Sequence, residues 1–131
     1  MRLDIDCVRA VLLEAEACDF DEMPLFSDFA NNVMKRGNYS PLDIEYACHK
    51  LDEANFLKII TSNSFSRHTP DIIHIVDITY AGHQFLADIR EETVWDNVKG
   101  IAQKIGSTSV NGITQIASNV VAELIKAHFG L

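Results

Sequence analysis

Cys48 and His49 are the residues of this chain whose types could do nucleophilic chemistry, because a histidine beside a cysteine can activate the thiol. They are adjacent in a stretch that is predicted to be helical, and neighbours on a helix point about 100° apart. The two side chains therefore cannot easily act on one atom or hold one ion. Glu91 and Glu92 form an acidic pair that a solvated surface explains. We expect no enzymatic activity and no catalytic residue.

A zinc site would need close pairs of cysteine or histidine ligands. Neither C-x-x-C nor H-E-x-x-H occurs in the sequence. The three cysteines form an odd set without metal-type spacing, which is typical of a reduced intracellular protein. The sequence therefore predicts no metal, no cofactor and a cytoplasmic location.

The composition indicates one soluble domain with an appendage. The chain has 131 residues, of which 47% are hydrophobic, and its net charge is −8. No apolar run approaches the ~20 residues of a membrane span, and the acidic N-terminus does not resemble a secretory signal. An acidic chain repels nucleic acid at long range unless a local basic patch offsets its charge.

Local signals predict the elements of the first half of the chain. A helix should run from Asp4 or Asp6 to Ala17, with the aspartates as caps. A second helix should begin at Ser40-Pro41, because serine at the cap and proline at the first position are preferred there. Its periodicity predicts a buried stripe of Ile44, Ala47, Cys48 and Leu51. Asn55 falls where a helix often ends in a left-handed residue.

Residues 18–39 leave two alternatives open: a short strand at 23–26, or a short helix with Phe29 and Val33 on one face. Strands are predicted at 57–61 and 72–79, joined by a polar hairpin loop over 62–71. Residues 82–105 should be helical, with 91–93 as the place where the helix could break. Its second part should bury an apolar stripe at helical spacing, made of Val94, Val98, Ile101 and Ile105.

Three segments carry a resemblance to a known family. They are Met1–Glu14, Tyr46–Ala54 and Thr79–Asp96, the last of which holds Gly-His-x-Phe-Leu followed by Thr-Val-Trp. Over most of residues 1–99 the chain resembles the prokaryotic and phage-associated domain of unknown function 2513. The resemblance implies a winged-helix fold and carriage by phages and mobile elements, and it implies no established activity. Asn55 stands where this turn usually has glycine.

The expected fold is mainly α with a small β-hairpin. It consists of a winged helix-turn-helix domain over residues 1–96 and a C-terminal helical tail over residues 97–131. In DNA-binding winged-helix proteins the recognition helix enters the major groove, and Arg and Lys hold the phosphates. Residues 39–55, which include this helix, hold four acids against Lys50 alone. Charge therefore disfavours conventional DNA binding.

We expect a regulatory or interaction protein of phage or mobile-element type that acts by protein contact, as an inhibitor, an antitoxin or a host-factor binder. The alternative is a DNA-binding transcriptional regulator that uses the winged-helix surface. The residues predicted to face a protein partner, or DNA in the alternative, are Asp43, Tyr46, His49, Lys50, Arg67 and His68.

The tail is predicted to be a linker over Gly106–Gly112 followed by a helix from Ile113 to about Phe129. This helix is apolar around most of its girth, so it must pack on the body or on another chain. The linker would let it reach away, and we expect a dimer or a higher oligomer. Trp95 is either a core residue or an anchor in an interface. The candidate oligomer interface comprises Trp95, Ile113, Ile116, Val120, Val121, Leu124 and Ile125.

Overall fold

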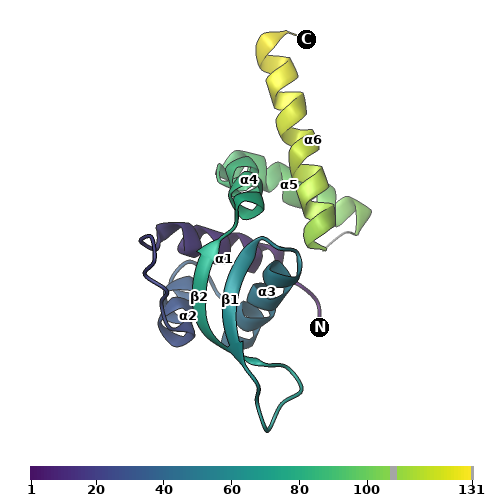
Figure 1. The fold of residues 1–131 in the computed structure, drawn as a ribbon. Helices are drawn as coiled ribbons and strands as arrows, with labels where there is room; N and C mark the ends of the chain where they lie inside the picture. Colours follow the sequence, from purple (N-terminus) through teal and green to yellow (C-terminus); the bar gives the residue numbers. More distant parts are fainter. Residues whose placement is uncertain (107–108, 131) are drawn as a thin grey trace.

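The computed structural model describes residues 1–106 and 109–130 and contains helices and one two-stranded antiparallel sheet (Figure 1). In chain order the elements are α1 (Ile5–Ala17), α2 (Phe26–Met34), α3 (Pro41–Glu53), β1 (Leu57–Ser62), β2 (Asp71–Ile78), α4 (Tyr80–Ile89), α5 (Glu92–Ile105) and α6 (Val110–Phe129). The prediction of a mainly helical chain with a small hairpin is confirmed. None of the described helices is both long and apolar enough to cross a membrane.

The first turns of α1 and α3 are fixed by the caps that the sequence indicates. The Asp4 carboxylate accepts hydrogen bonds from the Asp6 and Cys7 amides at 3.0 and 3.3 Å. Ser40 and Asp43 form a reciprocal capping box, with both bonds at 3.1 Å. These contacts satisfy amides that would otherwise lack a partner.

Both alternatives for residues 18–39 hold in part. Leu25 forms an isolated antiparallel bridge with His74 of β2, and α2 begins at the next residue. The Ile75 amide donates to the Pro24 carbonyl at 3.2 Å. The apolar face of α2 is buried through Phe29, Ala30 and Val33.

The β1–β2 hairpin connects α3 to α4. β1 and β2 pair antiparallel from Leu57 opposite Ile78 to Ser62 opposite Asp71, with two register shifts. Asn55 has φ 64°, as predicted for the residue that ends the preceding helix. Thr79 then caps α4 by accepting from the Gly82 amide at 3.0 Å. Because Thr79 is the cap, α4 begins two residues before the predicted start at Gly82.

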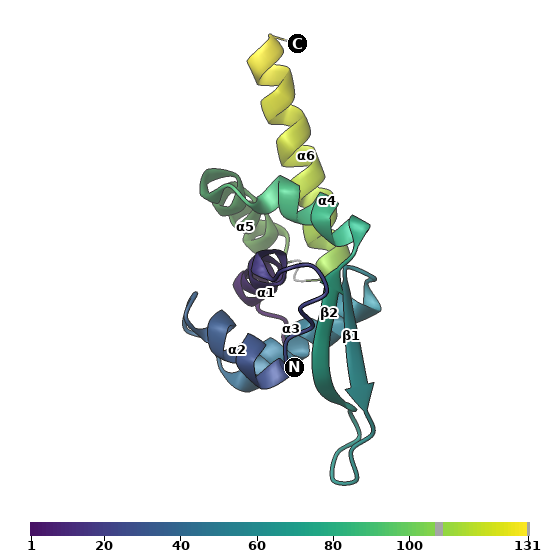
Figure 2. The ribbon, with the colours of Figure 1, turned by 60° about the vertical axis from the view of Figure 1, so that its left-hand side comes forward.

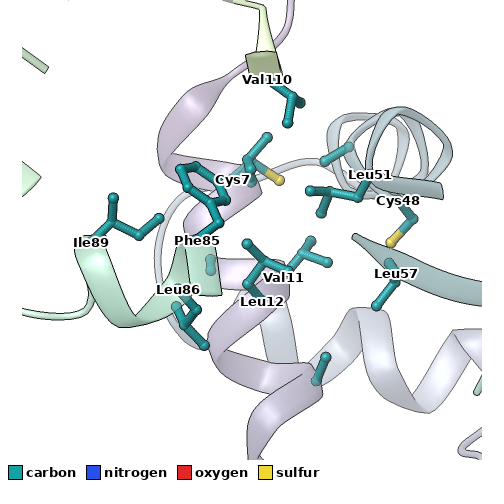
Figure 3. Packing of buried hydrophobic residues seen from close by; sticks show 14 of the residues in the cluster. Cys7, Val11, Leu12, Cys48, Leu51, Leu57, Phe85, Leu86, Ile89 and Val110 are labelled. Carbon is teal, nitrogen blue, oxygen red and sulfur yellow. The ribbon is translucent and has the colours of Figure 1, made fainter. Parts of the chain in front are cut away.

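One core extends from α1 to the first half of α6. Figure 3 shows side chains of α1, α3, β1, α4 and the start of α6 packed together. Val98 and Ala102 of α5, and Ile113 and Ala117 of α6, belong to the same cluster of buried residues. The predicted boundary between residues 96 and 97 therefore falls inside α5, and the first half of α6 is part of this core.

The predicted linker over Gly106–Gly112 is corrected. α6 begins at Val110, because the Ser109 hydroxyl caps it by accepting from the Gly112 amide at 3.0 Å. Gly106 ends α5 in a left-handed conformation with φ 71°. Ser107 and Thr108 of the predicted linker lie outside the described residues.

The buried face of α5 also differs from the predicted stripe. Val98 is buried as expected, but Ile101 and Ile105 are 40% and 64% exposed, and Ala102 is buried in their place. Trp95 sets this phase, because its indole nitrogen donates to the Asp6 carboxylate of α1 at 2.8 Å. Arg9 lies 5.9 Å from the centre of the same ring. Trp95 is therefore a core residue that pins α5 to α1.

Candidate interaction surfaces

The first surface is the α3–hairpin face, defined as the exposed side of α3 together with the loop of residues 63–70. It contains all six residues predicted to meet a partner: Asp43, Tyr46, His49, Lys50, Arg67 and His68. Figure 1 shows this loop extending beyond the helices at the end of the molecule away from α6. The structure brings the loop onto α3 through Arg67.

Glu45 is the centre of this contact. Arg67 donates from Nη2 to Glu45 Oε1 at 3.0 Å, and its Nη1 lies 3.0 Å from Glu45 Oε2. The same Nη1 lies 3.1 Å from the carboxylate of Asp71. These charge-assisted hydrogen bonds raise the pKa of Arg67, which is already a cation, and the bond to Glu45 contributes most. The cation of the loop is therefore neutralised by two carboxylates of this chain.

Lys50 is paired in the same way. Its Nζ lies 2.8 Å from the Glu53 carboxylate, and this hydrogen bond raises the pKa of Lys50. Lys50 also lies 5.3 Å from the centre of the Tyr46 ring. The Tyr46 hydroxyl donates to the Met1 carbonyl at 3.1 Å. Tyr46 therefore ties the N-terminus to α3 as well as supporting the lysine.

The remaining predicted residues differ in role. Asp43 is committed to the capping box at the start of α3, so its carboxylate serves the helix. The Nε2 atom of His49 lies 3.8 Å from Glu45 Oε2 and has no hydrogen-bond partner among the described residues. His68 is exposed in the loop.

Glu45 is the residue of this face that the sequence prediction missed. Its spacing to His49 is readable from the sequence, because residues four apart meet on a helix. Its pairing with Arg67, 22 residues along the chain, depends on how the hairpin folds back.

Large apolar side chains are exposed beside these ion pairs. Leu42 is 64% exposed and lies three and four residues before Glu45 and Tyr46, on the same side of α3. Phe65, in the loop that carries Arg67, is fully exposed. The α3–hairpin face thus combines neutralised cations with apolar groups.

The second surface is the α5–α6 surface, defined as the exposed side of α5 together with α6 from Val120 onward. Trp95, Ile113 and Ile116 of the predicted interface are 3%, 2% and 8% exposed, so they belong to the core of the chain itself. Of the other residues of the predicted interface, Val120 and Val121 are half-buried, and Leu124 and Ile125 are exposed. Only these four remain accessible to a partner.

An open groove of about 520 Å³ lies between α5 and α6. Gly100 and Ile101 of α5 and Val120 and Leu124 of α6 line it with apolar atoms. Charged residues also line it: Asp96 and Lys104 on α5 and Glu123 on α6. The sequence missed the α5 wall, because the predicted stripe placed Ile101 in the core.

The three cysteines are free thiols, and burial lowers the reactivity of each. Cys7 and Cys48 lie inside the core (Figure 3). Burial, with smaller contributions from Asp4 and Asp43, raises the pKa of Cys7 to about 12, and burial also raises the pKa of Cys48. Cys18 is half-buried, and burial followed by the nearby charge of Glu22 raises its pKa to about 11.

We predict that a disulfide reagent reacts slowly with one thiol of the native protein and rapidly with all three after unfolding. Because the thiolate is the nucleophile, a pKa of about 11 lowers the reactive fraction of Cys18 roughly a hundredfold relative to an unshifted thiol. Release of thionitrobenzoate, with and without denaturant, measures this. The C18S variant should remove the slow native phase. Fast release of two equivalents from the native protein would contradict the burial of Cys7 and Cys48.

Comparison with known proteins gives one match. The model of the family described as hypothetical protein (DUF2513) matches residues 2–109. The match covers α1 to α5 and ends at Ser109, the cap of α6. No curated protein and no solved structure matches the chain. Because the matched segment is most of the chain, the protein belongs to the uncharacterised DUF2513 family.

Proposed function

We propose that this protein is a regulatory or interaction protein that acts by contact with another protein through the α3–hairpin face. One observation carries the proposal: both predicted partner-facing cations, Arg67 and Lys50, are already paired with carboxylates of the chain. Such a partner would be inhibited, neutralised or recruited by the contact. The phage or mobile-element setting rests on the family resemblance alone.

A winged-helix arrangement is the finer description of the fold that we infer. The order of α1, the bridge at Leu25, α2, α3, β1 and β2 supports it. In this description α3 takes the place of the recognition helix, and residues 63–70 form the wing. The α3–hairpin face is then the surface that DNA-binding members of the fold class use.

Charge argues against DNA on this face. To reach a phosphate, Arg67 would have to leave Glu45 and Asp71, and the half-buried Glu45 would remain close to the DNA backbone without its cation. This face, together with Asp71 at the base of the loop, holds five carboxylates, those of Asp43, Glu45, Asp52, Glu53 and Asp71, against two cations. Affinity for duplex DNA depends on the number of phosphates that cations neutralise, so this balance predicts weak binding.

The exposed apolar groups suit a protein partner better. Aromatic residues are enriched in protein interfaces, and charges are depleted at their centres. Phe65 and Leu42 supply apolar area, while Arg67, paired with Glu45 and Asp71, contributes a rim of slightly acidic ion pairs. A partner with a shallow apolar pocket fits this combination.

We predict that binding to random duplex DNA at physiological salt is weaker than the ~10⁻⁴–10⁻⁶ M typical of non-specific binders. Fluorescence anisotropy with a labelled duplex measures it. In parallel, affinity capture from a host should retain a protein that F65A and L42E each lose. Y80A is the matched control, because Tyr80 is 80% exposed but lies just beyond the opposite end of β2.

The same experiments test the alternative, a DNA-binding transcriptional regulator. The winged-helix order of elements is the observation that favours it. A specific duplex bound at nanomolar affinity, and lost in K50E or R67E, would overturn protein contact and establish the regulator. Retention of the captured protein by F65A and L42E would move the contact away from the α3–hairpin face.

A further inference from the structure

The second half of α6 is largely exposed within the described chain, and only Val120 there packs against the core. Every residue from Ala122 to Gly130 is exposed, and Leu124, Ile125 and Phe129 are 46%, 51% and 70% exposed. Figures 1 and 2 show this end of α6 projecting away from the other elements in both views. Short helices without tertiary contacts are marginal in water, so a contact that covers this end would also stabilise it.

The groove beside this helix is the complementary feature. It is lined mainly by apolar atoms, and the space beside Gly100 is open, since a Cβ added there would meet nothing within 4 Å. Small residues of this kind let a helix approach closely. Ile101 and Ile105 expose the apolar edge of α5 next to it.

We propose that the α5–α6 surface binds a second copy of this chain, with α6 of each copy covering the groove of the other around a two-fold axis. The groove and the projecting helix lie on the same pair of helices, so one symmetric contact covers both surfaces twice. This self-association is separate from the proposed function, which uses the α3–hairpin face.

Charge supports a second copy as the occupant. Residues 1–96 hold eighteen acids against eight bases, whereas residues 97–131 hold Glu123 against Lys99, Lys104 and Lys126. Two copies that meet through the helices at the C-terminal end therefore keep their acidic bodies apart. Lys104 and Glu123 lie on opposite walls of the groove. Glu123 also lies 3.6 Å from Lys126 of its own helix. A two-fold axis that places each Lys104 beside the partner's Glu123 would therefore give this carboxylate a second cation, at two equivalent places.

The area that a stable dimer buries indicates that the groove is part of the interface. A stable interface buries roughly 800 Å² on each partner. The projecting end of α6 from Val120 to Phe129 is only about 15 Å long, so a contact between two such ends alone would be small. A contact that includes the groove adds Ile101 and Ile105 of α5 to the interface.

Sedimentation of the full-length chain from about 1 μM to about 1 mM, which spans weak to strong association, tests the proposal. We expect a reversible monomer–dimer equilibrium. G100Q fills the groove and should weaken association about a hundredfold, because the change occurs twice in a two-fold contact. A87Q is the control, since it places the same side chain on an exposed small residue of α4 outside the groove. It should leave the equilibrium unchanged.

Mixing two charge variants tests directly whether the α5–α6 surface contacts a second copy of the chain. K104E and E123K should each associate about tenfold more weakly than the natural chain, since both symmetric pairs become repulsive. An equimolar mixture should recover the association, because each variant then supplies the charge that the other lacks. Circular dichroism checks that the variants remain folded.

Three outcomes would overturn the proposal: a monomer over the whole concentration range, an unchanged equilibrium in G100Q, or a mixture that associates no better than its components. The first would leave the α5–α6 surface to a different protein. None of the three bears on capture through the α3–hairpin face.

Discussion

A chain that ends at Ile105 will not reach a stable fold, whereas a chain that ends at Ala122 will melt close to the full-length protein. The shorter chain loses Val110, Ile113 and Ile116, each at most 8% exposed. Burying a side chain of this size is worth roughly 1.5–3 kcal/mol, so the three together contribute about 5–9 kcal/mol. That is comparable with the whole stability of a small domain, about 5–15 kcal/mol.

The longer truncation is the matched control, because every described residue that it removes is exposed. Thermal unfolding followed by circular dichroism measures the difference, at a concentration where the full-length protein is monomeric. A cooperative transition at the full-length temperature in the chain that ends at Ile105 would show that α6 is dispensable for the core. A large loss of stability on ending at Ala122 would show that the projecting half of α6 contacts the body.

Gly82 is the position where a single methyl group should have the largest effect. A Cβ at residue 82 would lie 2.2 Å from the Phe56 carbonyl oxygen and 2.8 Å from a side-chain carbon of Ile78. The Phe56 carbonyl also accepts the Thr79 amide at 3.1 Å, so it cannot move without loss of that bond. We expect G82A to lower the free energy of unfolding by about 3 kcal/mol, the upper part of the range for overpacked cores.

G100A provides the control in the same kind of element. Gly100 lies in α5, and an added Cβ there meets nothing within 4 Å. Alanine is favoured over glycine inside a helix by roughly 0.5–1 kcal/mol, so G100A should raise the free energy of unfolding. Urea unfolding of both variants measures the two effects, and equal shifts of the same sign would refute the close approach at Gly82.

Local signals in the sequence determined several elements. Asp4 and the Ser40–Pro41 pair begin α1 and α3 where predicted, and Asn55 ends the turn after α3 in a left-handed conformation. The buried stripe of α3 also follows from periodicity, through Ile44, Ala47, Cys48 and Leu51. Caps, turns and helical spacing depend on interactions between residues a few positions apart, so they can be predicted from a short stretch of sequence.

The short strand-like contact at Leu25 could not be assigned in the same way. It pairs with His74, which follows three other elements in the chain. Either alternative for residues 18–39 satisfied the local pattern. Only the position of β2 beside this segment shows that both occur, one after the other.

Some features of the α3–hairpin face were predictable from the sequence, and others depended on the tertiary structure. The sequence predicted six of its residues and the excess of acids over bases. The pairing of Arg67 with Glu45 depends on the hairpin folding back onto α3, a contact between residues 22 apart. The tertiary structure therefore decided that the cation of the loop is neutralised rather than offered to a partner.

In the C-terminal helices the sequence likewise could not determine which apolar residues are buried. The sequence determined that the last helix carries more apolar surface than one packing face needs. It could not decide which part is covered, because hydrophobic burial depends on what lies opposite rather than on the residue itself. The hydrogen bond from Trp95 to Asp6 turns α5 so that Ala102 is buried and Ile101 is exposed. Tertiary packing thereby placed Ile113 in the core and left Leu124 and Ile125 beside an open groove.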